Sequence, residues 1–367
     1  MLIGVDLGLT NARAAWVEDG KPVLLETLTG RRVIPAAVGI DPNGQLHVGE
    51  SARNQHLLDP EQATTRLRRL LGTTQRVILA EKSFSAQELV AVVLSQVKEF
   101  AEQRLGGTIT ALALAVPCDF TATQSQAAIA AARLAGFRMV QLILEPVAIA
   151  AAYGLHPQEL TAEQPILVCD LGARSCEAAV IQRDERGVGF AIKSSAGNQA
   201  GSDECDLRIV GHLAHLYERE FGLSPHGSRK AMARLRLAAE WTKRTLSQQD
   251  STTVRLPGLL NVAHTPFDLV AELSREQLEL LVDDELRKSL QAVEIALREA
   301  RLGPSQLHAV LLSGGGAEMP LFARLIEEMV LVRPREGVPP EEAIARGAAL
   351  VGASRLGDGS GSLPAQR

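Results

Sequence analysis

Two aspartates occur in the same short motif in different halves of the chain. Asp6-Leu7-Gly8 follows the apolar run Leu2 to Val5, and Asp170-Leu171-Gly172 follows the apolar run Ile166 to Cys169. Each run has the length of a buried strand, and the glycine after the carboxylate lets the chain turn tightly and expose backbone N–H groups. For either copy alone, a motif that merely begins a hairpin is the alternative. The recurrence favours a duplicated phosphate-handling fold, in which paired turns contact one nucleotide from both sides.

Two other segments place residues capable of chemistry at the ends of predicted strands. Glu145-Pro146 follows the apolar run Met139 to Leu144 and opens a helix with proline at its first position. Glu145 therefore lies at a strand-to-helix junction, where ligands bind in open α/β sheets. Leu307 to Leu312 leads into Gly314, Gly315 and Gly316. These glycines would let the backbone pass close to a ligand, and a plain flexible turn is the alternative.

An alternation of helices and strands surrounds these residues. Capping boxes at Ser85/Glu88 and Thr121/Gln124 predict helices that reach about Gly106 and Gly136, with a strand between them. Three strands joined by hairpins are predicted in the second half, and helices then dominate. The predicted elements are strands at Ile109 to Val116, Ile166 to Cys169, Ala178 to Gln182 and Phe190 to Ser195, and helices at Asp203 to Phe221, Ser228 to Ser247, Ser274 to about Arg301 (with a break) and Pro340 to Ala353.

Composition excludes several classes of function. The 367 residues are 46% hydrophobic, enough for a large core and two or more domain-sized units. Aromatic residues make up only 3% and the net charge is −5, which argues against a nucleic-acid partner. No apolar stretch reaches the roughly 18 residues of a membrane span, and the start shows no leader, so we predict a cytoplasmic protein with no membrane partner. The cysteines, 118, 169, 176 and 205, lack metal-ligand spacing and are predicted to be buried thiols.

Stretches spread along the whole chain match one known family in the same order. They include Ile3 to Asn11 (IGVDLGLTN), Leu67 to Gly72 (LRRLLG), Glu145 to Leu155 (EPVAIAAAYGL), Ala238 to Ser247 (AAEWTKRTLS), Gly314-Gly315 and Glu342 to Ala349 (EAIARGAA). On these motifs the chain resembles the nucleotide-binding (ATPase) domain of the heat-shock-seventy, or DnaK-like, chaperones of the actin/hexokinase superfamily. The blocks at 145–155 and 243–247 are the most specific to the family.

The resemblance implies an α/β, actin-like ATPase fold with two lobes around a cleft, each lobe built on a duplicated β-sheet. Lobe I is expected at 1–156 with an inserted subdomain at about 25–85, and lobe II at 157–339 with an inserted, mostly helical subdomain at about 203–287. A C-terminal helix at 340–356 would pack back on lobe I, followed by a flexible tail at 357–367. The peptide-binding domain of the family is missing from this sequence. We therefore expect either a chain cut at the linker or, as we favour, a stand-alone module.

The resemblance also assigns roles at the site. Asp6 and Asp170 match the carboxylates that hold Mg²⁺ and its waters, in keeping with the preference of Mg²⁺ for oxygen ligands. Glu145 matches the glutamate that orients the attacking water, and Asp170, Arg68 and Ser175 are the other catalytic candidates. For Lys243 and Arg244, an ordinary solvated helix face is the alternative. Contacts to ATP or ADP are expected from Gly8, Leu9, Thr10, Asn11, Gly172, Ala173, Gly201, Ser202, Glu240, Lys243, Arg244, Ser247, Gly314, Gly315, Gly316, Glu318 and Glu341.

Several positions depart from the family pattern. Arg68 replaces a lysine beside the γ-phosphate, and a planar guanidinium does not reproduce a compact ammonium. Leu9 replaces a threonine, which removes a hydroxyl donor. In the second turn Gly-Gly-Thr becomes Ala173-Arg174-Ser175, and the aspartate two positions later is Glu177. Glu318 stands where an arginine normally stacks on the base. Together these changes predict ATP binding with slow or absent hydrolysis.

Three hypotheses for function follow. The first, which we favour, is a Mg-ATP/ADP-dependent conformational switch that acts on a protein partner, either a co-chaperone or a regulated protein. The second is an active ATPase or a small-molecule kinase, because Asp6 to Arg13 is similar to the start of glucokinases. No catalytic aspartate of the sugar-kinase type is evident in mid-chain, which counts against sugar transfer. The third is a nucleotide-free scaffold.

Overall fold

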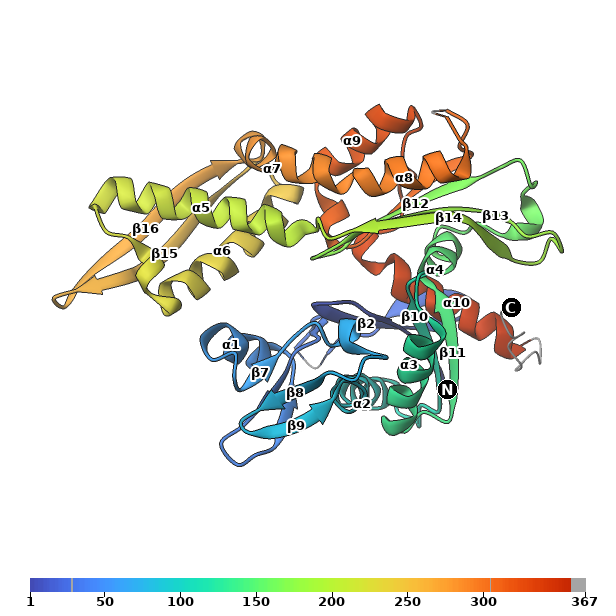
Figure 1. Cartoon of the computed structure of the whole chain (residues 1–367), viewed down its shortest axis with the longest axis horizontal. Helices are drawn as coiled ribbons and strands as arrows, with labels where there is room; N and C mark the ends of the chain where they lie inside the picture. The colour runs from blue at the N-terminus through green and yellow to red at the C-terminus, as the bar shows by residue number, and fades with distance from the viewer. Residues whose placement is uncertain (28, 304, 358–367) are drawn as a thin grey trace.

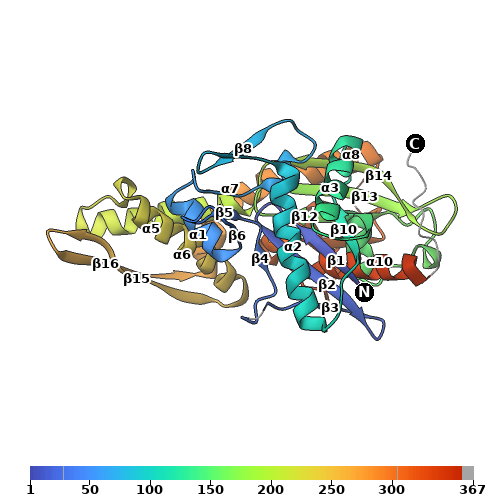
Figure 2. The same ribbon diagram turned by 90° about the horizontal axis from the view of Figure 1, so that it is seen from below.

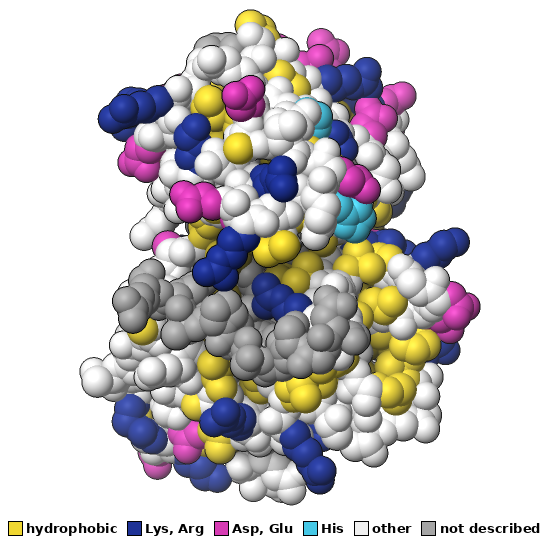
Figure 3. All heavy atoms as spheres, turned by 90° about the vertical axis from the view of Figure 1, so that its right-hand side faces the viewer, with side chains coloured by type: hydrophobic (Ala, Val, Ile, Leu, Met, Phe, Trp, Pro, Cys, Tyr) yellow, Lys and Arg dark blue, Asp and Glu magenta, His cyan; other side chains and the backbone are white. Residues whose placement is uncertain are grey.

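Two large sheets, one from each half of the chain, organise the molecule (Figure 1). The computed structural model describes residues 1–27, 29–303 and 305–357. Seen from the side in Figure 3, the molecule narrows between an upper and a lower body, and charged side chains of both signs are interspersed over the upper one. The α/β class predicted from the sequence is confirmed.

The first sheet has the strand order β11-β10-β1-β2-β3, with β4 pairing β2. Its strands are β1 (Leu2–Leu7), β2 (Asn11–Glu18), β3 (Lys21–Leu24), β4 (Ile34–Pro35), β10 (Ala111–Val116) and β11 (Met139–Leu144). All six residues of β10 are buried because both faces of the sheet are covered. Leu112 and Leu114 pack towards α2 (Ala86–Leu105) and α3 (Ala122–Leu134), whereas Ala113 and Ala115 pack towards α4 (Glu145–Ala152) and α10 (Ala343–Gly357).

The second sheet has the order β14-β13-β12-β17. Its strands are β12 (Ile166–Leu171), β13 (Cys176–Arg183), β14 (Phe190–Asn198) and β17 (Ala309–Ser313). Leu167, Cys169 and Leu171 point into a core shared with α8 (Gln291–Ala300) and α9 (Pro320–Val330). Ile166 and Val168 point the other way, into the cluster that contains α4 and α10. This cluster therefore joins the two halves.

Close backbone contact between α4 and α10 holds this junction together. A Cβ placed on Gly347 of α10 would lie 1.7 Å from the carbonyl oxygen of Ala148 in α4, so only glycine allows the two helices to cross at this distance. α10 also contacts β1, β2 and β10 of the first sheet. Two of the stretches that match the family, 145–155 and 342–349, thus supply the two sides of one helix crossing.

Smaller units are attached to each half. The first carries β5 (Val38–Ile40), β6 (Leu46–Val48), α1 (Glu50–Leu58), β7 (Ala63–Thr64), the 3₁₀ turn Leu67–Leu70, β8 (Arg76–Leu79) and β9 (Lys82–Ser85). The second carries α5 (Ser202–Phe221), α6 (Arg229–Gln248), β15 (Ser251–Val262), β16 (Thr265–Ser274) and α7 (Arg275–Ser289). Figure 2 shows the β15–β16 hairpin reaching away from the rest of the molecule.

Most predicted elements are present. The capping boxes at Ser85, Thr121 and Ser274 all form, and the helix predicted from Ser274 breaks at Leu290 as expected. The sequence analysis missed the β15–β16 hairpin, because its turn uses Ala263 and His264 at positive φ rather than the glycine that usually marks such a turn. Three of the cysteines, 169, 176 and 205, are buried as predicted. Of the tail predicted at 357–367, only Gly357, the last residue of α10, is among the described residues.

No helix in the described ranges combines the length and the apolar character that crossing a bilayer requires.

Candidate functional site

A cavity of about 850 Å³ opens between the two halves. It lies where β1, β12 and β17 end and where α4 begins, so loops and helix starts supply its walls. Nearly all the residues predicted for the site line it. They are Asp6, Gly8, Leu9, Thr10, Asn11, Arg68, Glu145, Asp170, Gly172, Ala173, Ser175, Ser202, Glu240, Lys243, Arg244, Gly314, Gly315, Gly316 and Glu341.

The two Asp-Leu-Gly motifs form matching hairpins on opposite walls of the cavity. The N–H of Gly8 donates to the carbonyl oxygen of Asn11 at 2.8 Å, and the N–H of Gly172 donates to that of Ser175 at 2.9 Å. The first hairpin joins β1 to β2 and the second joins β12 to β13, both antiparallel. The duplication predicted from the sequence is therefore present at the level of backbone hydrogen bonds.

The neighbours of the two aspartates differ. Asp6 pairs across the strands with Arg13, whereas Asp170 pairs with Glu177. Burial raises the pKa of Asp6, while Arg13 and Arg68 act against the shift. Burial and the charge of Glu177 raise the pKa of Asp170 to about 7. The second hairpin thus concentrates negative charge where the first one balances it.

Asp170 carries a buried oxygen without a partner among the described residues. Its Oδ1 accepts no hydrogen bond. Gly314, at φ 86°, follows β17 beside it, and a Cβ there would lie 2.7 Å from this oxygen and 2.3 Å from the carbonyl oxygen of Leu171. A side chain at 314 would therefore collide with the second hairpin, while Gly315 faces open space. The glycines at 314 and 315 keep this wall close to Asp170 and open towards the cavity.

Arg68 and Glu145 form a buried ion pair. Nη1 of Arg68 lies 2.5 Å from Oε1 of Glu145, and their side chains are only 10% and 4% exposed. Nη2 of Arg68 also lies 4.0 Å from Glu177. Burial would lower the pKa of Arg68, but the surrounding carboxylates hold it above its ordinary value. Burial raises the pKa of Glu145 to about 7 despite the opposing effect of Arg68. Glu145, which was predicted to orient the attacking water, is therefore already paired with Arg68.

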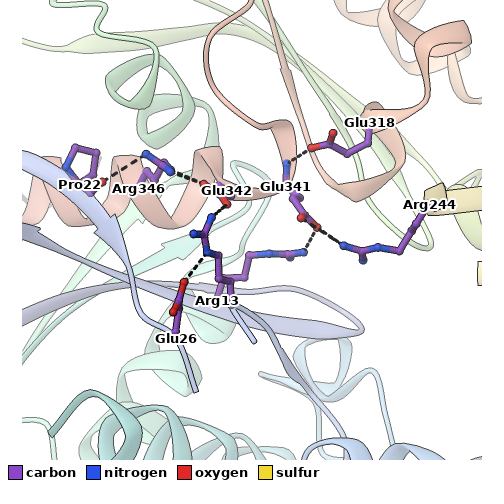
Figure 4. A network of polar contacts seen from close by, with 9 residues as sticks. Arg13, Pro22, Glu26, Arg244, Glu318, Glu341, Glu342 and Arg346 are labelled. Carbon is purple, nitrogen blue, oxygen red and sulfur yellow. Dashed lines mark hydrogen bonds and ion pairs between the residues drawn. The ribbon is translucent and has the colours of Figure 1, made fainter. Parts of the chain in front are cut away.

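At the α6 end of the cavity, Glu341 connects the two halves (Figure 4). Arg13 of β2 donates to Oε2 of Glu341 at 2.5 Å, and Arg244 of α6 donates to the same oxygen at 3.0 Å. Glu318 accepts the backbone N–H of Glu341 at 3.5 Å. Nearby, Nζ of Lys243 donates to the carbonyl oxygen of Ser202 and to Asp206. Lys243 and Arg244, which were expected to meet adenosine, are thus both engaged in ion pairs.

Three predicted residues do not line the cavity. The Oγ of Ser247 donates to the carbonyl oxygen of Lys243 within α6, and Glu318 lies behind Glu341. Gly201 precedes α5, and a Cβ there would lie 2.4 Å from the backbone of Arg174. Gly201 therefore allows the second hairpin loop to rest against the start of α5, where the N–H groups of Ser202 and Asp203 donate to Gly172 and Ala173.

The sequence analysis did not select several arginines of the cavity. Arg53 of α1 forms an ion pair with Glu240 of α6 at 2.9 Å and so crosses the opening. Arg66 and Arg13 line the cavity as well. Arg13 was predictable, because a hairpin that pairs Gly8 with Asn11 also places residue 13 opposite Asp6. Arg53 and Arg66 come from the inserted segment, where hydrophobic periodicity gives no indication of which side faces the cavity.

The donor set fits a magnesium ion with most of its water shell. Within the described residues, no cluster of three His, Cys, Asp or Glu side chains could hold a metal by itself. Two carboxylates on facing walls, one with a free buried oxygen, suit an ion that retains waters and shares a ligand's phosphate oxygens. The glycine hairpins offer the close backbone approach that phosphates require. This arrangement suits a nucleoside phosphate.

Comparison with known proteins agrees with the geometry. The family described as Hsp70 protein matches residues 2–360. The chain is 33% identical over 358 residues to "Chaperone protein DnaK" of Thermosipho africanus, covering 97% of this chain and 59% of that protein. It is 33% identical over 360 residues to the protein of the same name from Mycoplasmopsis agalactiae, covering 98% of this chain and 59% of that protein. The chain thus spans about three fifths of the length of these relatives. It belongs to the Hsp70 protein family, and its fold is the actin-like ATPase fold of that family.

Proposed function

We propose that the chain binds Mg-ATP and Mg-ADP in the cavity between its halves and acts as a conformational switch with weak or absent hydrolysis. The buried Arg68–Glu145 ion pair carries this proposal, because it occupies the group expected to orient water while leaving the two glycine hairpins open. Because the relatives are named chaperones, we propose that the conformational change acts on a protein partner.

In this proposal Asp6 and Asp170 hold the magnesium ion through its waters, and the bound ion would neutralise charge on the phosphates. The backbone N–H groups of the Gly8–Asn11 and Gly172–Ser175 loops contact the phosphates. Gly314, Gly315 and Gly316 pass beside the nucleotide. At the other end, Arg244 is half exposed and can leave Glu341 to lie against the base.

Hydrolysis is weak for three reasons in this account. Oε1 of Glu145 accepts a hydrogen bond from Nη1 of Arg68, so this carboxylate holds a water poorly. Leu9 offers no hydroxyl to the transferring group, and Arg174 adds a side chain to the second turn where the family pattern has glycine. Removing a single preorganised donor costs about 10²- to 10³-fold in rate. Several such changes together leave binding as the main activity.

A nucleotide-free scaffold is the second candidate, favoured by one observation. Arg53–Glu240 and Arg13–Glu341–Arg244 connect the two halves with the protein's own side chains. In a scaffold, these ion pairs would hold the two halves together permanently. A switch would break or reform them when nucleotide binds.

Titration calorimetry separates the two candidates. We expect Mg-ADP and Mg-ATP to bind at one site per chain, and we expect EDTA to weaken both. The variants Asp6→Asn and Asp170→Asn should bind poorly, whereas Asp284→Asn, on the exposed surface of α7, should bind like the unaltered protein. Absence of binding by the unaltered protein would leave the scaffold.

A further inference from the structure

Two arginines from opposite halves face each other across the cavity near the second hairpin. Arg66 belongs to the first half and precedes the 3₁₀ turn that contains Arg68. Arg174 lies at the tip of the Gly172–Ser175 loop in the second half. Both line the cavity, and each is close in sequence to a residue expected to contact phosphate.

The two arginines differ in their partners. Arg174 is held by one carboxylate, with its Nη1 donating to Asp203 at 2.9 Å. The side chain of Arg66 makes no hydrogen bond or ion pair with the described part of the chain. Burial and the charge of Arg174 both lower the pKa of Arg66, so the two guanidinium groups repel each other. Asp203 and Glu204 act against this shift, so the side chain of Arg66 lies among charges of both signs at the cavity wall without forming an ion pair.

The backbone at Arg66 is in a conformation that costs energy. Its φ is 63°, in the left-handed region that an arginine rarely adopts. The turn thus holds the unpaired side chain of Arg66 at the cavity, where it is available to a ligand. A phosphate group is the natural ligand, because guanidinium groups bind phosphate oxygens in a planar, bidentate arrangement.

Resting on the proposed function, we infer that Arg66 and Arg174 together bind the terminal phosphate of a nucleoside triphosphate and so connect the two halves only when that phosphate is present. Arg68 is unsuited to this role because Glu145 and Glu177 already engage it. Arg66 is exposed whereas the side chain of Arg68 is buried, so Arg66 is the one of the two that an incoming phosphate can reach. ATP would therefore be distinguished from ADP by an arginine from each half.

The test compares Mg-ATP and Mg-ADP affinities by calorimetry for Arg66→Ala, Arg174→Ala and the double variant. Each single change should weaken Mg-ATP about tenfold, as expected for a lost charged hydrogen bond, and leave Mg-ADP within about twofold. The double variant should lose little more than either single one, because both arginines share one phosphate. Arg66→Lys and Arg174→Lys should recover part of the affinity. Arg69→Ala, next along the same turn, is the matched control and should change nothing.

The outcomes separate this inference from the proposed function. If the unaltered protein binds neither nucleotide, both fail. If it binds Mg-ADP and the Arg66 and Arg174 variants keep the same ratio of ATP to ADP affinity, only this inference is overturned. Equal losses for both nucleotides would also overturn it. A third titration, of inorganic phosphate into the Mg-ADP complex, identifies the source of the phosphate. Arginine-dependent binding there would support the same anion site, with free phosphate as a second ligand.

Discussion

The two Asp-Leu-Gly hairpins have the same backbone and different electrostatics. Both close with a glycine N–H that donates to the carbonyl three residues on, and both place an aspartate on the cavity wall. Across the strands, Asp6 faces Arg13 and Asp170 faces Glu177. Backbone N–H groups can contact phosphate whatever the side chains are, so in the proposed function both hairpins bind the same nucleotide. The two aspartates have different charged neighbours, so we expect their pKa values to change by different amounts when the ligand binds.

This difference in charged neighbours gives the two aspartates different electrostatic surroundings. In the first hairpin the charges of Arg13 and Arg68 oppose the effect of burial on the pKa of Asp6. In the second hairpin Asp170 and Glu177 repel each other, and burial raises the pKa of both to about 7. A bound cation would relieve that repulsion. In the proposed function, the second half of the molecule is therefore the half expected to respond to the metal.

Neutralising each aspartate in turn sharpens the comparison most. Asp6→Asn and Asp170→Asn should each weaken Mg-nucleotide about 10- to 100-fold, the usual cost of losing a group that holds a metal's surroundings. Without nucleotide, Asp170→Asn should raise the melting temperature more than Asp6→Asn, because it removes a carboxylate that repels Glu177. Calorimetry and thermal unfolding measure the two effects. Equal stabilisation by both variants would contradict the asymmetry.

Arg68 lies between the hairpins and gives the second test. Arg68→Lys places a compact ammonium there and should release Glu145, so single-turnover phosphate release should rise at least about tenfold, within the range that one catalytic donor contributes. The measurement uses enzyme in excess over Mg-ATP. A detectable rate that this change leaves unaltered would argue against the ion pair as the cause of weak hydrolysis.

The stability of the ligand-free protein should depend on pH through the second half. The folded-state pKa values of Glu145, Asp170 and Glu177 are all raised to about 7, so their contribution to stability is present at low pH and lost as pH rises towards 8. We expect the free energy of unfolding to fall by about 1–3 kcal/mol between pH 5.5 and pH 8 in EDTA. Asp170→Asn should flatten this slope. A free energy of unfolding that rises between pH 5.5 and pH 8, measured by urea titration, would contradict the raised pKa values of these three carboxyl groups.

The smallest expected effect concerns the ion pair across the opening. Arg53→Ala removes the contact with Glu240 and should speed nucleotide dissociation about two- to fivefold, the scale of a partly exposed ion pair. Stopped-flow displacement of a fluorescent nucleotide measures the rate. Arg31→Ala, whose partner Glu50 lies in the same half, is the control. Equal rates for both variants would show that the Arg53 pair does not restrain the ligand.

Local signals predicted much of this molecule from its sequence. The apolar runs, the capping boxes and the glycine turns each depend on neighbours in the chain, and they placed the strands that lead into the site, several helix starts and the two aspartates correctly. Pairings between distant residues were not predictable. Glu341 is 328 residues from Arg13, and Arg68 is 77 residues from Glu145, so only the folded chain shows that these charges neutralise each other.

One measurement tests the central claim most directly. Excess protein is mixed with Mg-ATP labelled on its γ-phosphate, the protein is rapidly separated, and the nucleotide that stays with it is identified. The account predicts protein-bound ATP that remains intact over many minutes. Unbound nucleotide, or bound ADP with its phosphate released within seconds, would contradict it.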